Sequence, residues 1–205
     1  MRFAFLLVAA MTAAAGSTHA SSFDGFYVGG QLGHNSTDIK VTENWTPATY
    51  DGFSADGADF GLFAGYGRTF DGPLYLGAEL EVNSSSAVNK IATATDTLKT
   101  EKERSYGIAA RAGYAMDSVM PYVRVGYSKA KFKQTLTGTI AASDDESKGG
   151  IALGAGIEVK ATDNVAFRGE FVRTSYGKIT ETSGANTITY DPTENVARVG
   201  VSVRF

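Results

Sequence analysis

The chain has 205 residues, of which 43% are hydrophobic and 20% charged, so it is neither disordered by composition nor apolar enough for a helical membrane protein. Its formal net charge of −3 provides no basic surface for nucleic acid, and the absence of cysteine excludes disulfides and thiolate metal sites. The 24 glycines, 10 tyrosines and 12 phenylalanines favour closely packed strands over helices.

Residues 1–20 have the organisation of a secretory signal peptide. Arg2 supplies the positive charge, residues 3–15 form the apolar region, and residues 18–20 place small side chains around a cleavage site. An apolar run of about 13 residues is too short to cross a bilayer as a helix. We therefore expect cleavage before Ser21 and a mature chain, residues 21–205, that forms a single domain. Retention of the segment as an N-terminal anchor is the alternative.

Beyond the signal peptide, apolar and polar residues alternate with a period of two, and no long apolar run occurs. In the last segment, Val199, Val201, Val203 and Phe205 share one face, and Arg198 lies on the other. A helix would spread these two classes around its circumference, whereas a strand separates them. Most of the segments are about 10 residues or longer, the length that a tilted membrane strand needs. The eight predicted strands are Phe26–His34, Asp59–Phe70, Leu74–Asn83, Glu103–Met116, Tyr122–Leu136, Gly149–Lys160, Val165–Tyr176 and Asn195–Phe205.

The connections between these segments alternate strictly in length. Residues 71–73, 117–121 and 161–164 form short turns, whereas the other four connections are long and polar. Bacterial outer-membrane barrels have short periplasmic turns and longer extracellular loops. A soluble eight-stranded barrel of the lipocalin kind has no reason for this segregation, and its apolar face would point inward. The long connections are residues 35–58, 84–102, 137–148 and 177–194.

The distribution of charge between the two strand faces favours a membrane barrel over a soluble one. A dry core would bury many ions, each costing several kcal/mol if unpaired. In a membrane barrel the apolar face meets lipid, and acids and bases neutralise one another in a polar lumen. The apolar face carries Leu62, Ala64, Tyr66, Leu74, Leu76, Ala78, Leu80, Val82, Ile108, Ala110, Ala112, Tyr114, Ile151, Leu153, Ala155, Ile157 and Val159. The opposite face carries Gln31, Glu79, Glu81, Arg111, Arg124, Glu158, Lys160, Arg168, Glu170, Arg198 and Arg204.

Aromatic residues of the apolar face lie where girdles at the two membrane interfaces require them. Tyr106 and Tyr114 share one segment and, at ~3.3 Å per residue and a ~40° tilt, lie about 20 Å apart along the membrane normal. This separation is close to the ~25 Å height of the apolar band. Ordinary β-propensity is the alternative explanation for these aromatics. At the periplasmic rim we expect Phe26, Tyr66, Phe167 and Phe205.

With these strands, turns and terminus in view, the chain resembles the small OmpA-like and OmpX-like outer-membrane barrels. It is most similar to the opacity-type "porin family" surface antigens of Gram-negative proteobacteria, and the resemblance covers the whole mature chain. Its most specific element is the last strand, in which Val199, Val201 and Val203 alternate toward the terminal Phe205, as in the assembly signal of this class. The resemblance implies an all-β, eight-stranded antiparallel transmembrane β-barrel that the barrel-assembly machinery recognises during biogenesis.

Paired charges in the lumen would block diffusion through so narrow a barrel. Eight strands enclose an interior that side chains fill, unlike the aqueous channel of a porin with about 16 strands. We expect an ion-paired plug and a closed or very small, intermittent conductance. The alternative function is a narrow porin-like channel for small solutes. The predicted lumen charge network consists of Glu79, Glu81, Arg111, Arg124, Glu158, Arg168, Glu170 and Arg198.

His34 is the candidate for catalysis, because some small barrels of this membrane are lipid acyltransferases, deacylases or proteases. Ser36 and Asp38 follow it near the predicted outer rim, and histidine-dependent acid–base chemistry would rest on this side chain alone. A polar residue where a strand leaves the membrane is the simpler explanation. We therefore expect no enzymatic activity, no cofactor and no metal site, and interpret the acidic residues 144–146 as a solvated turn rather than a calcium site.

Basic residues near the outer ends of two adjacent segments predict a patch that contacts lipopolysaccharide. Lys129, Lys131 and Lys133 share an outward face and lie about 15–25 Å above the start of their segment. Lys102 and Arg104 share the outward face of the neighbouring segment. Together these cations would lie level with the phosphates of the outer leaflet and pair with them. The alternative is that both segments project into solvent and carry ordinary surface charge.

The long polar connections are the expected recognition surface, because loops on a rigid scaffold commonly carry binding residues. They contain the only tryptophan, Trp45, with Pro47, Tyr50 and Phe53 nearby. These residues either form an adhesive apolar tip or fold back onto the rim. We therefore predict a structural and surface-interaction protein, serving envelope integrity, surface antigenicity or adhesion. Its expected partners are outer-membrane lipid, lipopolysaccharide and host or cell-surface ligands of the loops, but not nucleic acid.

Overall fold

The structure is a computed structural model that describes residues 23–43, 49–70, 72–86, 88–92, 97–137, 142–177, 179–183 and 186–205. The described residues form one antiparallel sheet that closes into a barrel. Two short strands, β4 (Val88–Ala92) and β9 (Ile179–Ser183), pair with β5 and β10 outside the wall. The predicted eight-stranded antiparallel barrel is confirmed. Its wall strands are β1 (Gly25–Glu43), β2 (Thr49–Thr69), β3 (Leu74–Ser85), β5 (Thr97–Tyr114), β6 (Val119–Thr137), β7 (Ala142–Lys160), β8 (Val165–Tyr176) and β10 (Asn186–Arg204).

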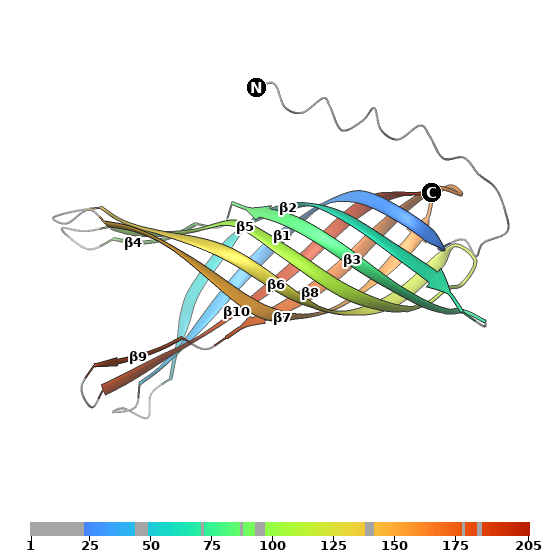
Figure 1. Ribbon diagram of the computed structural model, residues 1–205. Helices are drawn as coiled ribbons and strands as arrows, with labels where there is room; N and C mark the ends of the chain where they lie inside the picture. The colour runs from blue at the N-terminus through green and yellow to red at the C-terminus, as the bar shows by residue number, and fades with distance from the viewer. Residues whose placement is uncertain are drawn as a thin grey trace, which may run out of the picture.

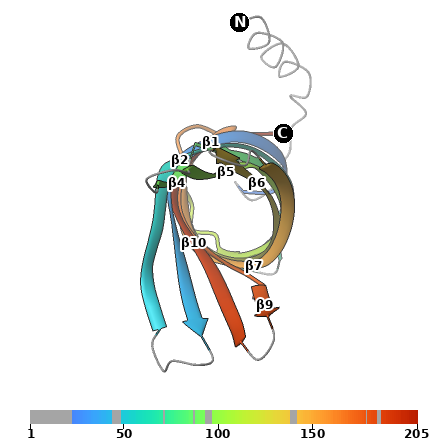
Figure 2. The same cartoon turned by 90° about the vertical axis from the view of Figure 1, so that its left-hand side faces the viewer.

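The barrel closes because its first and last strands pair with each other. β1 and β10 run antiparallel from Tyr27 opposite Arg204 to Glu43 opposite Ile188. Along the rest of the ring, each wall strand pairs with the wall strand that follows it in the chain. The view along the barrel in Figure 2 shows the resulting ring. A closed ring leaves no strand edge facing lipid, which is the condition for a sheet to cross a membrane.

The two ends of the barrel differ as the connection lengths predict. The short turns after β2, β5 and β7 lie at the end where β1 begins and the C-terminus lies, whereas β4 and β9 project from the other end (Figure 1). In the turn after β2, Gly72 has a φ of 86°, a conformation that glycine adopts without strain. The end with short turns is the periplasmic side, and the other is extracellular.

The strands continue further on the extracellular side than predicted. β1 ends at Glu43 rather than His34, and β7 begins at Ala142 rather than Gly149. Much of the predicted loops 35–58 and 177–194 is therefore strand. β2, β1, β10 and β9 leave the ring side by side as a sheet extension, which Figure 2 shows clearly. Trp45, Pro47 and the predicted signal peptide lie outside the described residues.

Apolar side chains face outward and charged side chains face inward. Phe26 is 67% exposed and Leu80 61%, whereas Glu79 and Arg111 are each 1% exposed. This is the inverse of a soluble barrel and matches a wall in contact with lipid. The described residues include no helix long and apolar enough to cross a membrane. The aromatics expected at the two interfaces are all exposed on this wall: Tyr106, Tyr114, Phe26, Tyr66, Phe167 and Phe205.

Inward-facing glycines make room for inward-facing aromatic rings. A Cβ atom at Gly67 would collide with the ring of Tyr75, and one at Gly65 would collide with the ring of Tyr27. Both tyrosines are almost fully buried. Glycines of this kind let large side chains in the lumen pack directly against the backbone of a strongly curved sheet. The interior is therefore packed with side chains against bare backbone.

Candidate functional site

The lumen is filled in layers, and the layer at the periplasmic end is apolar. Phe23, Tyr75, Met120 and Tyr122 form one buried cluster there. Phe23 precedes β1, and its main-chain carbonyl accepts a hydrogen bond from the guanidinium of Arg204. The segment before β1 thus packs into the periplasmic end of the barrel.

An upper ionic group, which lies nearer the extracellular side, contains two glutamates and two arginines. The guanidinium of Arg124 lies 3.1 Å from the carboxylate of Glu81 and 3.0 Å from that of Glu170. Arg198 contacts the same two carboxylates at 2.8 and 2.6 Å. The hydroxyl of Tyr122 donates a further hydrogen bond of 2.8 Å to Glu170. Each carboxylate is therefore shared by two guanidinium groups that reach it from different strands.

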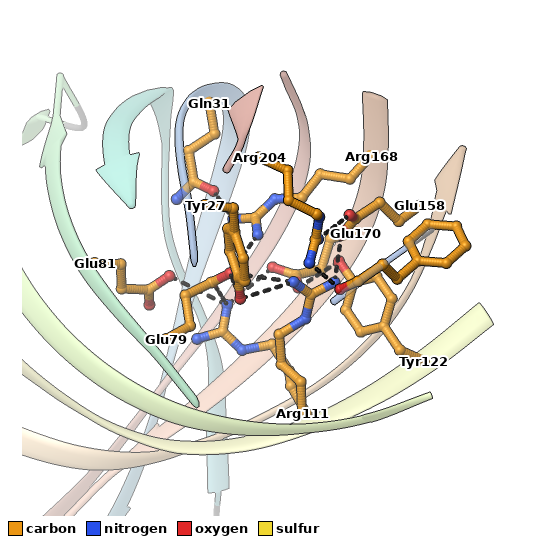
Figure 3. Close-up of polar contacts among 12 residues, drawn as sticks. Tyr27, Gln31, Glu79, Glu81, Arg111, Tyr122, Glu158, Arg168, Glu170 and Arg204 are labelled. Carbon is orange, nitrogen blue, oxygen red and sulfur yellow. Dashed lines mark hydrogen bonds and ion pairs between the residues drawn. The ribbon is translucent and has the colours of Figure 1, made fainter. Parts of the chain in front are cut away.

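A lower ionic group continues this network toward the periplasm, and Figure 3 shows its members. Glu79 lies 2.7 Å from Arg168 and 3.3 Å from Arg111. Glu158 lies 2.8 Å from Arg111 and 2.9 Å from Arg204. Because these charges are buried, their attraction is screened far less than that of surface pairs.

Aromatic rings support the arginines of this lower group. The guanidinium carbon of Arg168 lies 3.5 Å from the ring centre of Phe63, and that of Arg111 lies 3.9 Å from the ring centre of Tyr122. A desolvated contact of this kind contributes up to about 2 kcal/mol. Tyr122 also belongs to the apolar periplasmic layer, so its ring joins that layer to the ionic network.

The layer nearest the extracellular side is polar and joined by hydrogen bonds. The amide of Asn35 donates to Glu194 at 3.0 Å and to Ser85 at 2.9 Å. The hydroxyl of Tyr176 donates to the other oxygen of Glu194 at 2.7 Å. Side chains from β1, β3, β8 and β10 are thus tied together above the ionic groups.

The structure brings together all eight residues of the predicted charge network, and each is at most 6% exposed. Arg204 was predicted on the inner face but left out of the network, which it joins through its contact with Glu158. The inward aromatics Tyr27 and Phe63 were also missed. The same alternation places Tyr27 inward, because outward Phe26 precedes it. Aromatic residues of the strands were assigned only to the membrane interfaces, so aromatic residues at inward positions were overlooked.

The predicted basic patch is only partly formed by described side chains. Arg104 and Lys129 are exposed on the outer wall, and Lys131, which lies directly opposite Arg104, is half-buried. The register between β5 and β6 shifts between Lys102 and Arg104. A register shift interrupts the alternation on which the parity argument depends. The side chains of Lys102 and Lys133 lie outside the described residues.

His34 lies on the outer wall near the extracellular side, not in the lumen. Its Nε2 atom is 3.9 Å from a carboxylate oxygen of Asp56, and the two side chains are 70% and 61% exposed. The nearby Asp38 accepts a 3.4 Å hydrogen bond from Asn195. Among the residues that the structure describes, no group of three or more His, Cys, Asp and Glu side chains has the arrangement of a metal site.

The predicted assembly signal lies at the periplasmic end of β10, with Phe205 directly after the strand. Val199 is 57% exposed and Phe205 41% exposed on the outer wall, with Val201 exposed and Val203 half-buried between them. The backbone amide of Phe205 donates to the carbonyl of Phe26 at 2.8 Å. The terminal residue therefore completes the seam at which the barrel closes.

Comparison with known proteins agrees with this architecture. The model of the family described as "Outer membrane protein beta-barrel domain" matches residues 3–205. The "25 kDa outer-membrane immunogenic protein" of Brucella abortus is 30% identical over 186 residues, 90% of this chain and 80% of that protein. The "22 kDa outer membrane protein" of Rhizobium leguminosarum is 29% identical over 91% of this chain and 80% of that protein.

A solved structure has the same fold. The crystal structure of Neisserial surface protein A aligns with a TM-score of 0.51 and 20% sequence identity, covering 92% of this chain and all of that one. At this identity the likeness concerns the fold alone. The family match, the inverted wall and the closed ring together make this chain a member of the outer membrane protein β-barrel family and an integral protein of the bacterial outer membrane.

Proposed function

We propose that the barrel is sealed and acts as a structural and surface-interaction protein rather than as a pore. The ion-paired lumen carries this proposal: four glutamates and five arginines are joined across the barrel between an apolar and a polar layer. A solute that crossed would have to separate these pairs, and an uncompensated buried charge costs about 3–5 kcal/mol. The lipid-facing wall then supports the membrane, and the extracellular strands present the surface.

The proposed partners bind the extracellular strands, the outer wall and the terminal strand. Relatives that are named outer-membrane immunogenic proteins support exposure of the extracellular strands as a surface antigen. Exposed Arg104 and Lys129 support contact with the phosphates of lipopolysaccharide. The alternating apolar residues that end in Phe205 support recognition by the barrel-assembly machinery.

We also propose that the protein is not an enzyme. His34 faces outward on the lipid side of the wall with a single exposed acid at 3.9 Å, which is beyond hydrogen-bond distance. General acid–base catalysis needs the base within about 2.6–3.2 Å of the proton it moves. A His34→Ala variant should therefore have the same lipid composition in its host membrane as the wild type. Loss of a defined lipid modification in that variant would reverse this part of the proposal.

Single-channel recording in planar bilayers tests whether the lumen is sealed. We expect no stable conductance from the wild-type barrel at neutral pH. The double variant Arg124→Ala/Arg198→Ala removes both cations of the upper ionic group, so Glu81 and Glu170 would repel one another and draw in water. We expect measurable ion conductance from this variant, with a preference for cations.

The matched control is Arg173→Ala, which removes an exposed arginine from β8 outside the lumen and should stay silent. Steps of nanosiemens size from the wild type would overturn the sealed barrel and favour the narrow channel for small solutes. A silent double variant that migrates as a folded barrel would show that the upper ionic group is not the barrier.

A further inference from the structure

A groove on the lipid-facing wall lies below the basic residues of the extracellular end. It has a volume of about 830 Å³ and crosses β8, β10, β1, β2, β3 and β5. Its outward-facing side chains are apolar except at one end, where Ser84 and Arg104 lie. Lumen-facing residues of the same strands, among them Gln31 and Gly61, border its floor.

Gly30 creates this groove by leaving a gap in a row of large side chains. Val201, Gly30 and Leu62 are direct neighbours across three strands. A Cβ atom at Gly30 would have no other atom nearer than 3.9 Å, so open space lies above the residue. The adjoining row contains Leu32 and Phe60, both more than half exposed. The large side chains of these two rows form the walls of the groove on the outside of the barrel.

Between Gly30 and Arg104 the groove spans the outer half of the apolar band. Gly30 lies five residues after Gly25, the first residue of β1, and Arg104 lies ten residues before Tyr114, the last residue of β5. At ~3.3 Å per residue and a ~40° tilt, these positions are about 13 Å and about 25 Å above the periplasmic ends. For an apolar band of ~25 Å, Gly30 is at the midplane and Arg104 at the extracellular interface.

We propose that this groove binds one acyl chain of a lipopolysaccharide molecule, with the chain end over Gly30 and a lipid phosphate on Arg104. The inference rests on the proposed lipopolysaccharide contact and extends it from a basic patch to a site with a defined depth and orientation. Apolar walls accept the chain, and the guanidinium offers paired donors that match a phosphate.

Charge and position together select this occupant. The cations lie at the extracellular end of the groove, so a bound lipid has its headgroup there and belongs to the outer leaflet. Lys131 is directly opposite Arg104, and Lys129 lies two residues before it on β6. Arg104 and Lys129 are two exposed cations within one short stretch of adjacent strands, which favours a headgroup with more than one phosphate over a lipid with a single negative charge.

Two variants test the groove and the headgroup contact separately. Gly30→Leu places a side chain in the groove, and Arg104→Gln removes the cation at its end. The matched controls are Ala110→Leu, an exposed outward position of β5 away from the groove, and Arg173→Gln, an exposed basic position of β8. Folding of all four variants is checked first by heat-modifiable migration, since every substitution faces outward.

Binding is measured by native mass spectrometry of detergent-solubilised barrels titrated with lipopolysaccharide and, in a second series, with phosphatidylglycerol. We expect one tightly bound lipopolysaccharide on the wild type and on both controls. In Gly30→Leu and in Arg104→Gln the apparent Kd should rise roughly tenfold, which corresponds to about 1.4 kcal/mol.

Each other outcome has a definite meaning. Weaker binding in Arg104→Gln with unchanged binding in Gly30→Leu would overturn the groove and leave the basic patch in place. Equal affinity for phosphatidylglycerol and lipopolysaccharide would show that the occupant is wrong. Unchanged binding in both variants would overturn the groove and the proposed lipopolysaccharide contact together.

Discussion

At Gly67, the space that a side chain would occupy is filled by the ring of Tyr75 from the neighbouring strand. Tyr75 is fully buried and packs against Phe23, Met120 and Tyr122, so its ring has no room to move away. Inserting atoms into a packed interior of this kind typically costs about 1–3 kcal/mol. Gly67 therefore stabilises the barrel through its small size rather than through a contact of its own.

The substitution Gly67→Val should accordingly lower the free energy of unfolding by about 1–3 kcal/mol. The measurement is urea-induced unfolding in lipid vesicles, followed by the fraction of chain that migrates as a folded barrel. Gly169→Val is the control, because Gly169 faces outward and a Cβ atom added there would have no other atom within 4 Å. Equal unfolding midpoints for the two variants would contradict the packing role of Tyr75.

Individual residues of the lumen show what alternation predicts and what it omits. Alternation placed Glu79 and Glu81 on the inner face because the positions that alternate with them, Leu74, Leu76, Ala78, Leu80 and Val82, are apolar. Alternation gives no distances between side chains, so it could not predict that each carboxylate is shared by two arginines. Those distances depend on the stagger between strands that are far apart in sequence, which no local pattern encodes.

At the scale of strands, prediction was accurate inside the membrane and poor above it. β3 and β8 begin and end within two residues of the predicted limits. β1 was predicted nine residues too short at its extracellular end, because the face that carries Val28 and Leu32 continues after His34 with polar residues only. The hydrogen-bond ladder continues where the alternation stops, so the periodicity of side chains no longer reports the strand.

The register shift between Lys102 and Arg104 is a second feature that the sequence does not reveal. Parity extrapolated along β5 assumes one residue opposite one residue, and the shift adds an unmatched position at Glu103. Such irregularities are common where a strand leaves a barrel wall. Parity therefore cannot be carried across the shift from Arg104, which is exposed on the outer wall, to Lys102, whose side chain lies outside the described residues.

The terminal strand supports a prediction about assembly. Phe205 adds one hydrogen bond to the seam and an exposed ring to the outer rim, so its contribution to stability is small. If the assembly machinery recognises this residue, Phe205→Ser should sharply reduce the folded barrel in bacterial outer membranes. The same purified variant should refold in detergent with close to wild-type yield, because the rest of the ring is unchanged.

Phe167→Ser serves as the control for this experiment. Phe167 is another exposed aromatic near the periplasmic rim, at 56%, but it lies on β8 and not at the chain end. It should assemble normally in cells. Equal losses for the two variants in cells, or equal failure to refold in detergent, would mean that Phe205 acts through stability alone.

The whole molecule is organised by one inversion, with the apolar wall outside and the ionic network inside. This was the most predictable property, because it needs only two-residue alternation and the sign of the charges. The projecting sheet of β2, β1, β10 and β9 was the least predictable, since it joins β1 and β10, which lie at opposite ends of the sequence. Local sequence therefore predicts which residues face lipid and lumen inside the membrane. The shape of the extracellular end depends on pairing between strands that are far apart in sequence.

The inversion makes a depth-dependent prediction for the entire wall. Leu80 is 61% exposed and lies six residues after Leu74, the first residue of β3, so it is about 15 Å from the periplasmic end. Leu74 is 49% exposed at the rim. In vesicles, Leu80→Arg should lower the free energy of unfolding by about 2–4 kcal/mol, and Leu74→Arg by about 0–1 kcal/mol.

Reversible unfolding by guanidinium in phosphatidylcholine vesicles measures both values. A water-soluble barrel would tolerate arginine at either exposed position, with changes within about 0.5 kcal/mol. Small and equal losses would thus contradict a lipid-facing wall, whereas a large loss at Leu80 alone locates the hydrocarbon centre on β3. Because the lumen and the wall alternate residue by residue, a charge at Leu80 meets lipid while its neighbours Glu79 and Glu81 remain paired inside.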